Sequence, residues 1–147
     1  MRQLMKAGLV AMMFAMPAAM AQNASPAGVW KTIDESGKAR SLVRITEENG
    51  VLTGKIEKLF RPADQDQNPK CTACEGARKD QPIIGMTILS GLKKDGNEYT
   101  GGEILDPGKG KTYKSKASLK DNGSKLEVRG YIGAPMFGRS QTWVREQ

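Results

Sequence analysis

The 147-residue chain contains no histidine. This absence excludes catalytic triads built on histidine, histidine general bases and histidine-containing zinc sites. Aromatic residues are also scarce: two Trp, three Tyr and three Phe make up 5% of the chain. So few rings exclude a large aromatic core but suffice for a thin core shared between the faces of a sheet.

Only one long uncharged apolar stretch is present, and it lies at the N-terminus. Arg2 and Lys6 precede the apolar run 7–16, and a proline and small residues follow it. This order is typical of a cleavable secretory signal peptide. The run is too short to span a bilayer core, which needs about 20 apolar residues. We therefore expect residues 1–21 to be removed, leaving a periplasmic or secreted domain, residues 22–147, with no transmembrane anchor.

The formal net charge is +7, which would favour an anionic partner by long-range attraction. The lysines are scattered, however, and several alternate with apolar residues as they would on the wet face of a strand. The pattern indicates a solvated exterior rather than a nucleic-acid-binding face, so no nucleic-acid partner is expected.

Turn signals recur about every ten residues, and no segment of convincing length has helical periodicity. Glycine combined with asparagine, aspartate or serine marks most of these turns, because these residues tolerate positive φ. The segments between them predict eight strands, at residues 28–34, 40–47, 51–60, 83–92, 98–105, 111–120, 124–132 and 138–146.

Eight consecutive antiparallel strands in an open sheet would leave two exposed edges. Closure into an up-and-down barrel removes both edges, and a barrel of this size can hold one small ligand. The predicted fold class is therefore all-β, an eight-stranded antiparallel up-and-down barrel. A flattened sandwich of two sheets is the structural alternative.

A long polar loop, residues 61–82, interrupts the strand pattern and contains both cysteines. Cys71 and Cys74 are expected to form a disulfide in an oxidising compartment, with a redox role or metal binding as alternatives. Asp64 to Asn68, followed by Glu75, has the oxygen spacing of a calcium loop, but Pro69 replaces the glycine that its turn requires. An acidic solvated loop is the preferred interpretation, and neither a metal nor a cofactor is expected.

The first and last predicted strands carry the two tryptophans. Gly28-Val29-Trp30 begins the first strand, and Trp143-Val144-Arg145 ends the last one. These strands are neighbours in a closed barrel, so Trp30 is expected to plug one end with an arginine of the final strand across its face.

The connection 133–139 between the last two strands is apolar and flexible, which is unusual for a surface turn. We expect it to form a lid over the barrel mouth, with Met136 and Phe137 touching a ligand. The alternative is a loop that folds back onto the core.

Taken together, stretches along the whole of residues 22–147 resemble the bacterial domain-of-unknown-function family 2147. They are Gly28-Val29-Trp30-Lys31, Asn68-Pro69, Pro82-Ile83-Ile84-Gly85-Met86, Tyr99 to Pro107, Gly110-Lys111-Thr112-Tyr113, Leu126 to Gly133 and Gly138 to Trp143. The resemblance implies an exported bacterial protein with a lipocalin-like barrel and brings no established activity. It also implies that the cysteine pair belongs to a subgroup.

Two main hypotheses follow. In the first, the protein is not an enzyme and binds a small amphipathic or hydrophobic molecule inside the barrel. The candidate ligand-binding residues are Trp30, Tyr113, Tyr131, Met136, Phe137 and Arg139, with Arg139 at the mouth. In the second, Glu103 and Asp106 act as paired carboxylates of a hydrolase. A third hypothesis is a structural or protein-interaction role in the envelope.

Overall fold

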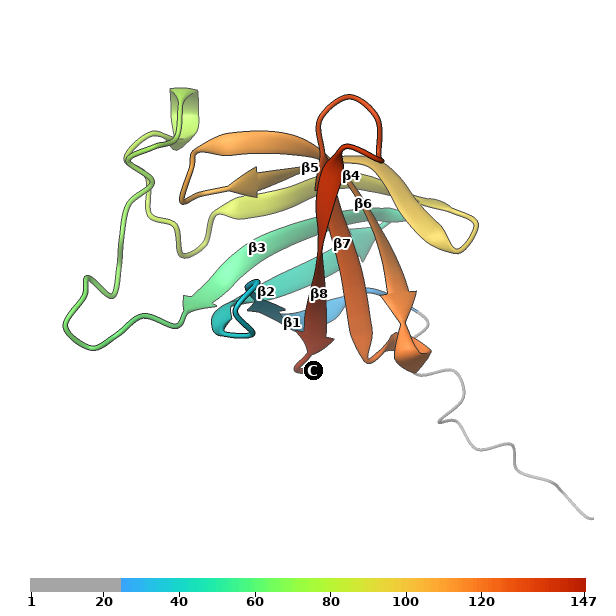
Figure 1. Ribbon diagram of the computed structural model, residues 1–147, viewed down its shortest axis with the longest axis horizontal. Coiled ribbons are helices and arrows are strands. Elements are labelled where there is room, and N and C mark those ends of the chain that lie inside the picture. The colour runs from blue at the N-terminus through green and yellow to red at the C-terminus, as the bar shows by residue number, and fades with distance from the viewer. Residues whose placement is uncertain (1–24) are drawn as a thin grey trace, which may run out of the picture.

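The computed structural model describes residues 25–147. Its eight antiparallel strands are hydrogen-bonded in sequence order and form a closed barrel (Figure 1). They are β1 (Gly28–Ile33), β2 (Ala39–Glu48), β3 (Val51–Leu59), β4 (Thr87–Asp95), β5 (Glu98–Asp106), β6 (Lys111–Lys120), β7 (Lys125–Tyr131) and β8 (Gly138–Arg145). The barrel predicted from the sequence is confirmed, and the alternative sandwich is wrong. The expected signal peptide, residues 1–21, lies outside the described residues.

Alternation along the strands builds the core. In β2, Val43 and Ile45 are buried while Arg44 and Thr46 are exposed. An apolar residue every second position therefore faces the lumen, and the intervening positions face solvent. Among residues 25–147, no helix is long and apolar enough to cross a membrane.

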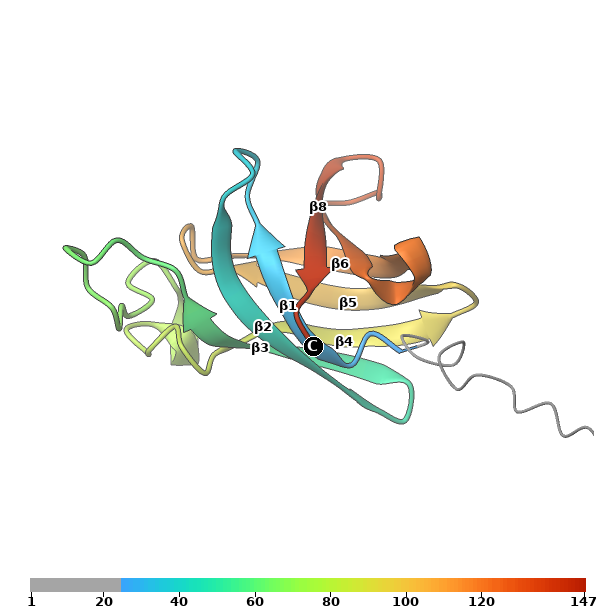
Figure 2. The same cartoon turned by 90° about the horizontal axis from the view of Figure 1, so that it is seen from below.

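The barrel closes between β1 and β8, but only over part of their length. These strands pair at Trp30↔Arg145 and Lys31↔Val144, whereas β7 and β8 pair along the whole of β7. Figure 2 shows β1 and β8 side by side near the C-terminus and spreading apart toward the opposite end. One end of the barrel is therefore sealed, and the other end opens at this seam.

Trp30 seals the closed end, as predicted. Its side chain is fully buried, its Nε1 donates to the carbonyl oxygen of Pro26 at 2.8 Å, and the Arg145 guanidinium stacks over its ring. Nearby, Tyr99 is buried and its hydroxyl lies 3.5 Å from the carboxylate of Glu47. Burial, followed by the neighbouring Glu47, raises the pKa of Tyr99.

The largest difference from the predicted strands is at β4, which runs from residue 87 to 95 instead of 83 to 92. The segment Ile83–Met86 forms a turn in which the Met86 N–H donates to the Ile83 carbonyl oxygen at 3.1 Å. Gly85 adopts φ +92° there, and its N–H donates to the carbonyl oxygen of Ile56. Ile83 and Met86 are nevertheless buried. Their apolar side chains gave this turn the sequence pattern of a buried strand.

Candidate functional site

A cavity of about 920 Å³ occupies the open end of the barrel. This volume is within the range of small-molecule binding sites. Three connections surround its mouth: β1–β2, β5–β6 and β7–β8. The apolar part of the lining comes from side chains on five strands and the last connection, namely Ile56, Leu59, Ile88, Ile104, Leu105, Val128, Ile132, Phe137 and Trp143.

Trp143 forms part of the cavity wall at its deep end, and sequence reasoning did not select it as a site residue. It is 1% exposed, and its Nε1 donates to the side-chain oxygen of Gln141 at 3.1 Å. Gln141 and Arg139 also line the cavity. The sequence could have indicated Trp143. Residues 139, 141, 143 and 145 face the same side of β8, and Arg145 had to face inward to reach Trp30.

A small polar group interrupts the apolar lining on the wall that β1 and β2 form. The hydroxyls of Thr32 and Ser41 lie 2.6 Å apart across the β1–β2 pair, and both side chains are buried. Because these hydroxyls satisfy each other, they can remain in the wall without a ligand.

The β1–β2 turn carries charged side chains at the rim. Asp34 accepts hydrogen bonds from the hydroxyl and N–H of Ser36, the N–H of Lys38 and the guanidinium of Arg40. These bonds, with that from the Ser36 hydroxyl the largest contributor, hold the pKa of Asp34 well below its usual range. Asp34 therefore stays ionised and fixes Arg40 at the mouth.

The gap between β1 and β8 is bridged at the rim by an ion pair. The Arg139 guanidinium donates to the carboxylate of Glu35 at 3.1 Å, and both side chains are 82% exposed. An ion pair this exposed contributes little stability. Arg139 can therefore exchange Glu35 for an anionic group at low cost.

The structure brings together four of the six candidate ligand-binding residues. Tyr113, Tyr131, Phe137 and Arg139 all line the cavity. Trp30 is not part of this lining, because it is buried at the closed end.

The β7–β8 connection does not fold back onto the core, which was the alternative to a lid. Met136 is 76% exposed and Phe137 is 69% exposed. Phe137 reaches the cavity lining, whereas Met136 does not. Only one of the two residues expected to touch a ligand therefore lies on the cavity.

Cys71 and Cys74 form the expected disulfide, and both are buried. Their segment packs against the β5–β6 turn, where the Cys71 sulfur lies 3.4 Å from the Pro107 carbonyl oxygen. A Cβ at Gly110 would lie 1.8 Å from the carbonyl oxygen of Ala73. Only glycine permits this close approach. The cysteine segment, residues 61–82, therefore packs tightly against the outside of the barrel at this point.

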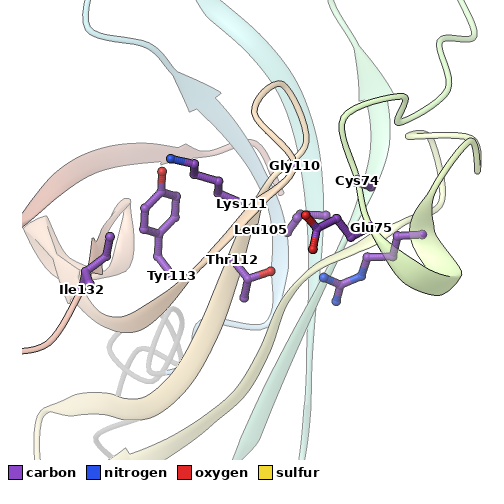
Figure 3. Close-up of a pocket in the computed structure, with 9 residues that line it drawn as sticks. Cys74, Glu75, Leu105, Gly110, Lys111, Thr112, Tyr113 and Ile132 are labelled. Carbon is purple, nitrogen blue, oxygen red and sulfur yellow. The ribbon is translucent and has the colours of Figure 1, made fainter.

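A second, smaller cleft of about 330 Å³ lies between the cysteine segment and β6. Figure 3 shows Lys111, Thr112 and Tyr113 along one strand, with Glu75 on the cysteine segment nearby. Tyr113 lines both this cleft and the barrel cavity, as do Leu105 and Ile132.

The acidic part of the cysteine segment is exposed. Asp64, Asp66 and Glu75 all face solvent, and the Asp66 carboxylate accepts the N–H of Asn68. Residues 25–147 contain no group of three His, Cys, Asp or Glu side chains that could hold a metal ion. The segment offers no calcium-like arrangement within that range.

The two carboxylates of the hydrolase hypothesis have different surroundings. Glu103 is exposed and stands opposite Lys114 on the outer surface of β5 and β6. Asp106 lines the cavity mouth, where it accepts the N–H groups of Gly108 and Lys109 in its own turn. Turn capping accounts for Asp106 without a catalytic role.

Residues 28–145 match the model of a family described as an uncharacterised protein conserved in bacteria, DUF2147. The chain belongs to the DUF2147 family. The matched residues span all eight strands, so the family extends over the whole barrel. No curated protein matches this DUF2147 chain.

Among solved structures, the DUF2147 chain is similar to protein HP1028 from Helicobacter pylori, which is described as belonging to the lipocalin family. The TM-score is 0.69 with 24% sequence identity, and the match covers 84% of each chain. At this identity the likeness establishes a shared lipocalin-like fold and nothing about the ligand.

Proposed function

We propose that this protein binds a small amphipathic molecule in the barrel cavity and does so outside the cytoplasm. The observation that carries the proposal is the cavity itself, about 920 Å³, with an apolar deep end and a charged rim. A molecule with an apolar body and one polar end matches this division of the lining. The lipocalin-like fold supports the proposal, since such barrels enclose one small ligand.

The arrangement of the lining predicts how the ligand lies. Its apolar part packs against Val128, Ile104 and Trp143, where burying apolar surface contributes about 25 cal/mol per Å². Its polar end lies at the rim beside Arg139, which exchanges Glu35 for an anionic group. Tyr113 and Tyr131 also line the cavity.

Binding without chemical turnover is part of the proposal. Export is also part of it, and the buried disulfide is compatible with an oxidising compartment. Cell fractionation, with mass spectrometry of the mature N-terminus, tests the export. Recovery of the full-length chain in the cytoplasm would reject it.

Native mass spectrometry of gently released protein tests for a bound molecule, and a thermal-shift screen against amphipathic and aromatic compounds tests for stabilisation. A ligand at 100 times its Kd stabilises the folded protein by about 2.7 kcal/mol. The screen therefore detects even moderate affinity.

Two adjacent residues of β8 provide a matched pair of variants. Gln141 lines the cavity, whereas Thr142 is exposed and outside the lining. We expect Gln141→Trp to weaken ligand binding at least tenfold and Thr142→Trp to leave it unchanged. Equal effects of both variants, or the absence of any ligand from the screen, would refute the proposal.

A further inference from the structure

The β7–β8 connection presents apolar side chains to solvent at the mouth of the barrel. Ile132, Met136 and Phe137 are 68%, 76% and 69% exposed. The other exposed large apolar side chain of the described residues, Val144, is 39% exposed and lies near the closed end. Exposed apolar surface is therefore concentrated at one tip, and such concentrations mark sites of interaction.

Hydrogen bonds hold this tip in its projecting conformation. The Arg129 guanidinium donates to the carbonyl oxygen of Pro135 at 2.6 Å, to the hydroxyl of Ser140 at 2.9 Å and to the carbonyl oxygen of Gly138 at 3.3 Å. Within the loop, the Phe137 N–H donates to the Ala134 carbonyl oxygen at 2.9 Å. The exposure of the apolar residues thus results from a defined loop structure.

Positive charge accompanies the apolar tip. Lys109 lines the cavity mouth together with Ile132, Lys111 lines the outer cleft together with Ile132, and Lys114 stands opposite Tyr131. Within residues 25–147, none of these three lysines forms a salt bridge.

Two acidic residues stand opposite this lysine group in register. Asp106 stands opposite Lys111 and accepts the N–H groups of Gly108 and Lys109, and Glu103 stands opposite Lys114. Within residues 25–147 neither carboxylate forms a salt bridge with these lysines, so the three ammonium groups can contact an external anion.

We propose that the mouth of the barrel docks on an anionic phospholipid bilayer. Met136, Phe137 and Ile132 insert among the headgroups, and Lys109, Lys111 and Lys114 contact the lipid phosphates. Surfaces that combine apolar and basic side chains bind anionic membranes. The burial of apolar surface and the attraction of basic residues to anionic lipids both contribute to the binding free energy. Docking in this orientation faces the cavity mouth toward the membrane.

Charge and size favour a bilayer over other occupants. A second copy of the chain, which is equally basic, would bring lysines against lysines. Three apolar side chains on one loop also provide less surface than the roughly 800 Å² per partner of a standard protein interface. A bilayer needs only a small tip to insert and supplies the opposite charge.

Vesicle co-sedimentation of the mature protein without added ligand tests the proposal. Vesicles contain either phosphatidylcholine alone or equal parts phosphatidylcholine and phosphatidylglycerol. We expect binding to the anionic vesicles at least tenfold stronger than to the neutral ones, and a strong decrease at 0.5 M salt. Equal binding to both vesicle types, or binding to neither, would overturn the proposal.

Variants test each component of the surface. Lys109→Gln/Lys111→Gln should lower the partition coefficient about 25-fold, since each lysine contributes about fivefold near an anionic surface. Met136→Ser/Phe137→Ser should lower it at least tenfold, and Val144→Ser at the closed end should leave it unchanged. An equal loss in Val144→Ser would overturn the proposal, as would unchanged binding in either double variant.

Two further measurements separate this proposal from ligand binding and from self-association. Met136 lies outside the cavity lining, so Met136→Ser should reduce vesicle binding while keeping the thermal shift caused by a cavity ligand. Sedimentation velocity should give a monomer for the wild type. A dimer that Met136→Ser/Phe137→Ser abolishes would overturn the membrane assignment in favour of a second copy.

Discussion

The guanidinium carbon of Arg145 lies 4.4 Å from the centroid of the Trp30 ring. Arg145 also donates hydrogen bonds to the carbonyl oxygens of Gly123, Ala27 and Ser25. It therefore joins the start of β1, the connection before β7 and the end of β8. Burial lowers the pKa of Arg145, yet arginine stays protonated at physiological pH.

Loss of Arg145 should destabilise the barrel strongly. We expect Arg145→Ala to lower the free energy of unfolding by about 3 kcal/mol, because it removes a cation–π contact and three charge-assisted hydrogen bonds. Arg145→Lys keeps the charge but loses the planar fork, and should cost about half as much. Urea denaturation measures both changes.

The control for Arg145 is Arg44, which pairs with Glu57 on the exposed outer surface of β2 and β3. Arg44→Ala should cost less than about 1 kcal/mol. Similar losses for Arg44→Ala and Arg145→Ala would show that the closed end does not depend on the stacked arginine.

Gly110 should be essential for holding the cysteine segment. It has φ +67°, and a Cβ there would overlap the Ala73 carbonyl. We expect Gly110→Ala to lower the free energy of unfolding by about 2 kcal/mol and to expose residues 61–82 to protease. Gly108→Ala is the matched control, since its nearest contact would be the Asp106 carboxylate at 3.3 Å. Proteolysis at the wild-type rate in Gly110→Ala would show that the contact between Gly110 and Ala73 does not hold this segment.

Two buried hydroxyls should respond in opposite directions to removal. Ser115 is fully buried and, within the described residues, its hydroxyl has no hydrogen-bond partner. Ser115→Ala should therefore keep the free energy of unfolding or raise it by up to about 1 kcal/mol. Thr32→Val removes the hydrogen bond with Ser41 and should lower the free energy of unfolding by about 1 kcal/mol. Thermal denaturation compares the variants, and a clear loss in Ser115→Ala would show that its hydroxyl is satisfied.

Asp34 should make the stability of the β1–β2 turn depend on pH. Its pKa is lower in the folded chain than in the unfolded chain, so its ionised form stabilises the fold. That contribution is complete above the unfolded pKa of about 3.9 and is lost as pH falls through the folded pKa. Asp34→Asn should be less stable than the wild type at pH 7, and the gap should close only in strong acid. A gap independent of pH would contradict this assignment.

Much of the fold was predictable from the sequence because its determinants are local. Turn residues and the alternation of Val43, Arg44 and Ile45 predicted the number of strands and the closure of the barrel. The Trp30–Arg145 contact followed from closure, since it needs only the adjacency of β1 and β8.

The candidate site was less predictable because it depends on tertiary geometry. The cavity is lined by Tyr113, Tyr131, Phe137 and Arg139. Trp30 does not line it, because this side chain is buried at the closed end. The pairing of β1 with β8 is limited to Trp30↔Arg145 and Lys31↔Val144, and no local residue pattern predicts where it ends. The contact between Gly110 and Ala73 joins segments distant in sequence, so no local pattern could predict it either.

The pairing of β1 with β8 also determines when the molecule can fold. Every other strand pair joins sequence neighbours, whereas this seam brings together Trp30 and Arg145 from the two ends of the barrel. Closing so long a loop is entropically costly and slow. An emerging polypeptide therefore cannot complete the barrel until β8 has been made, however early the other strand pairs form.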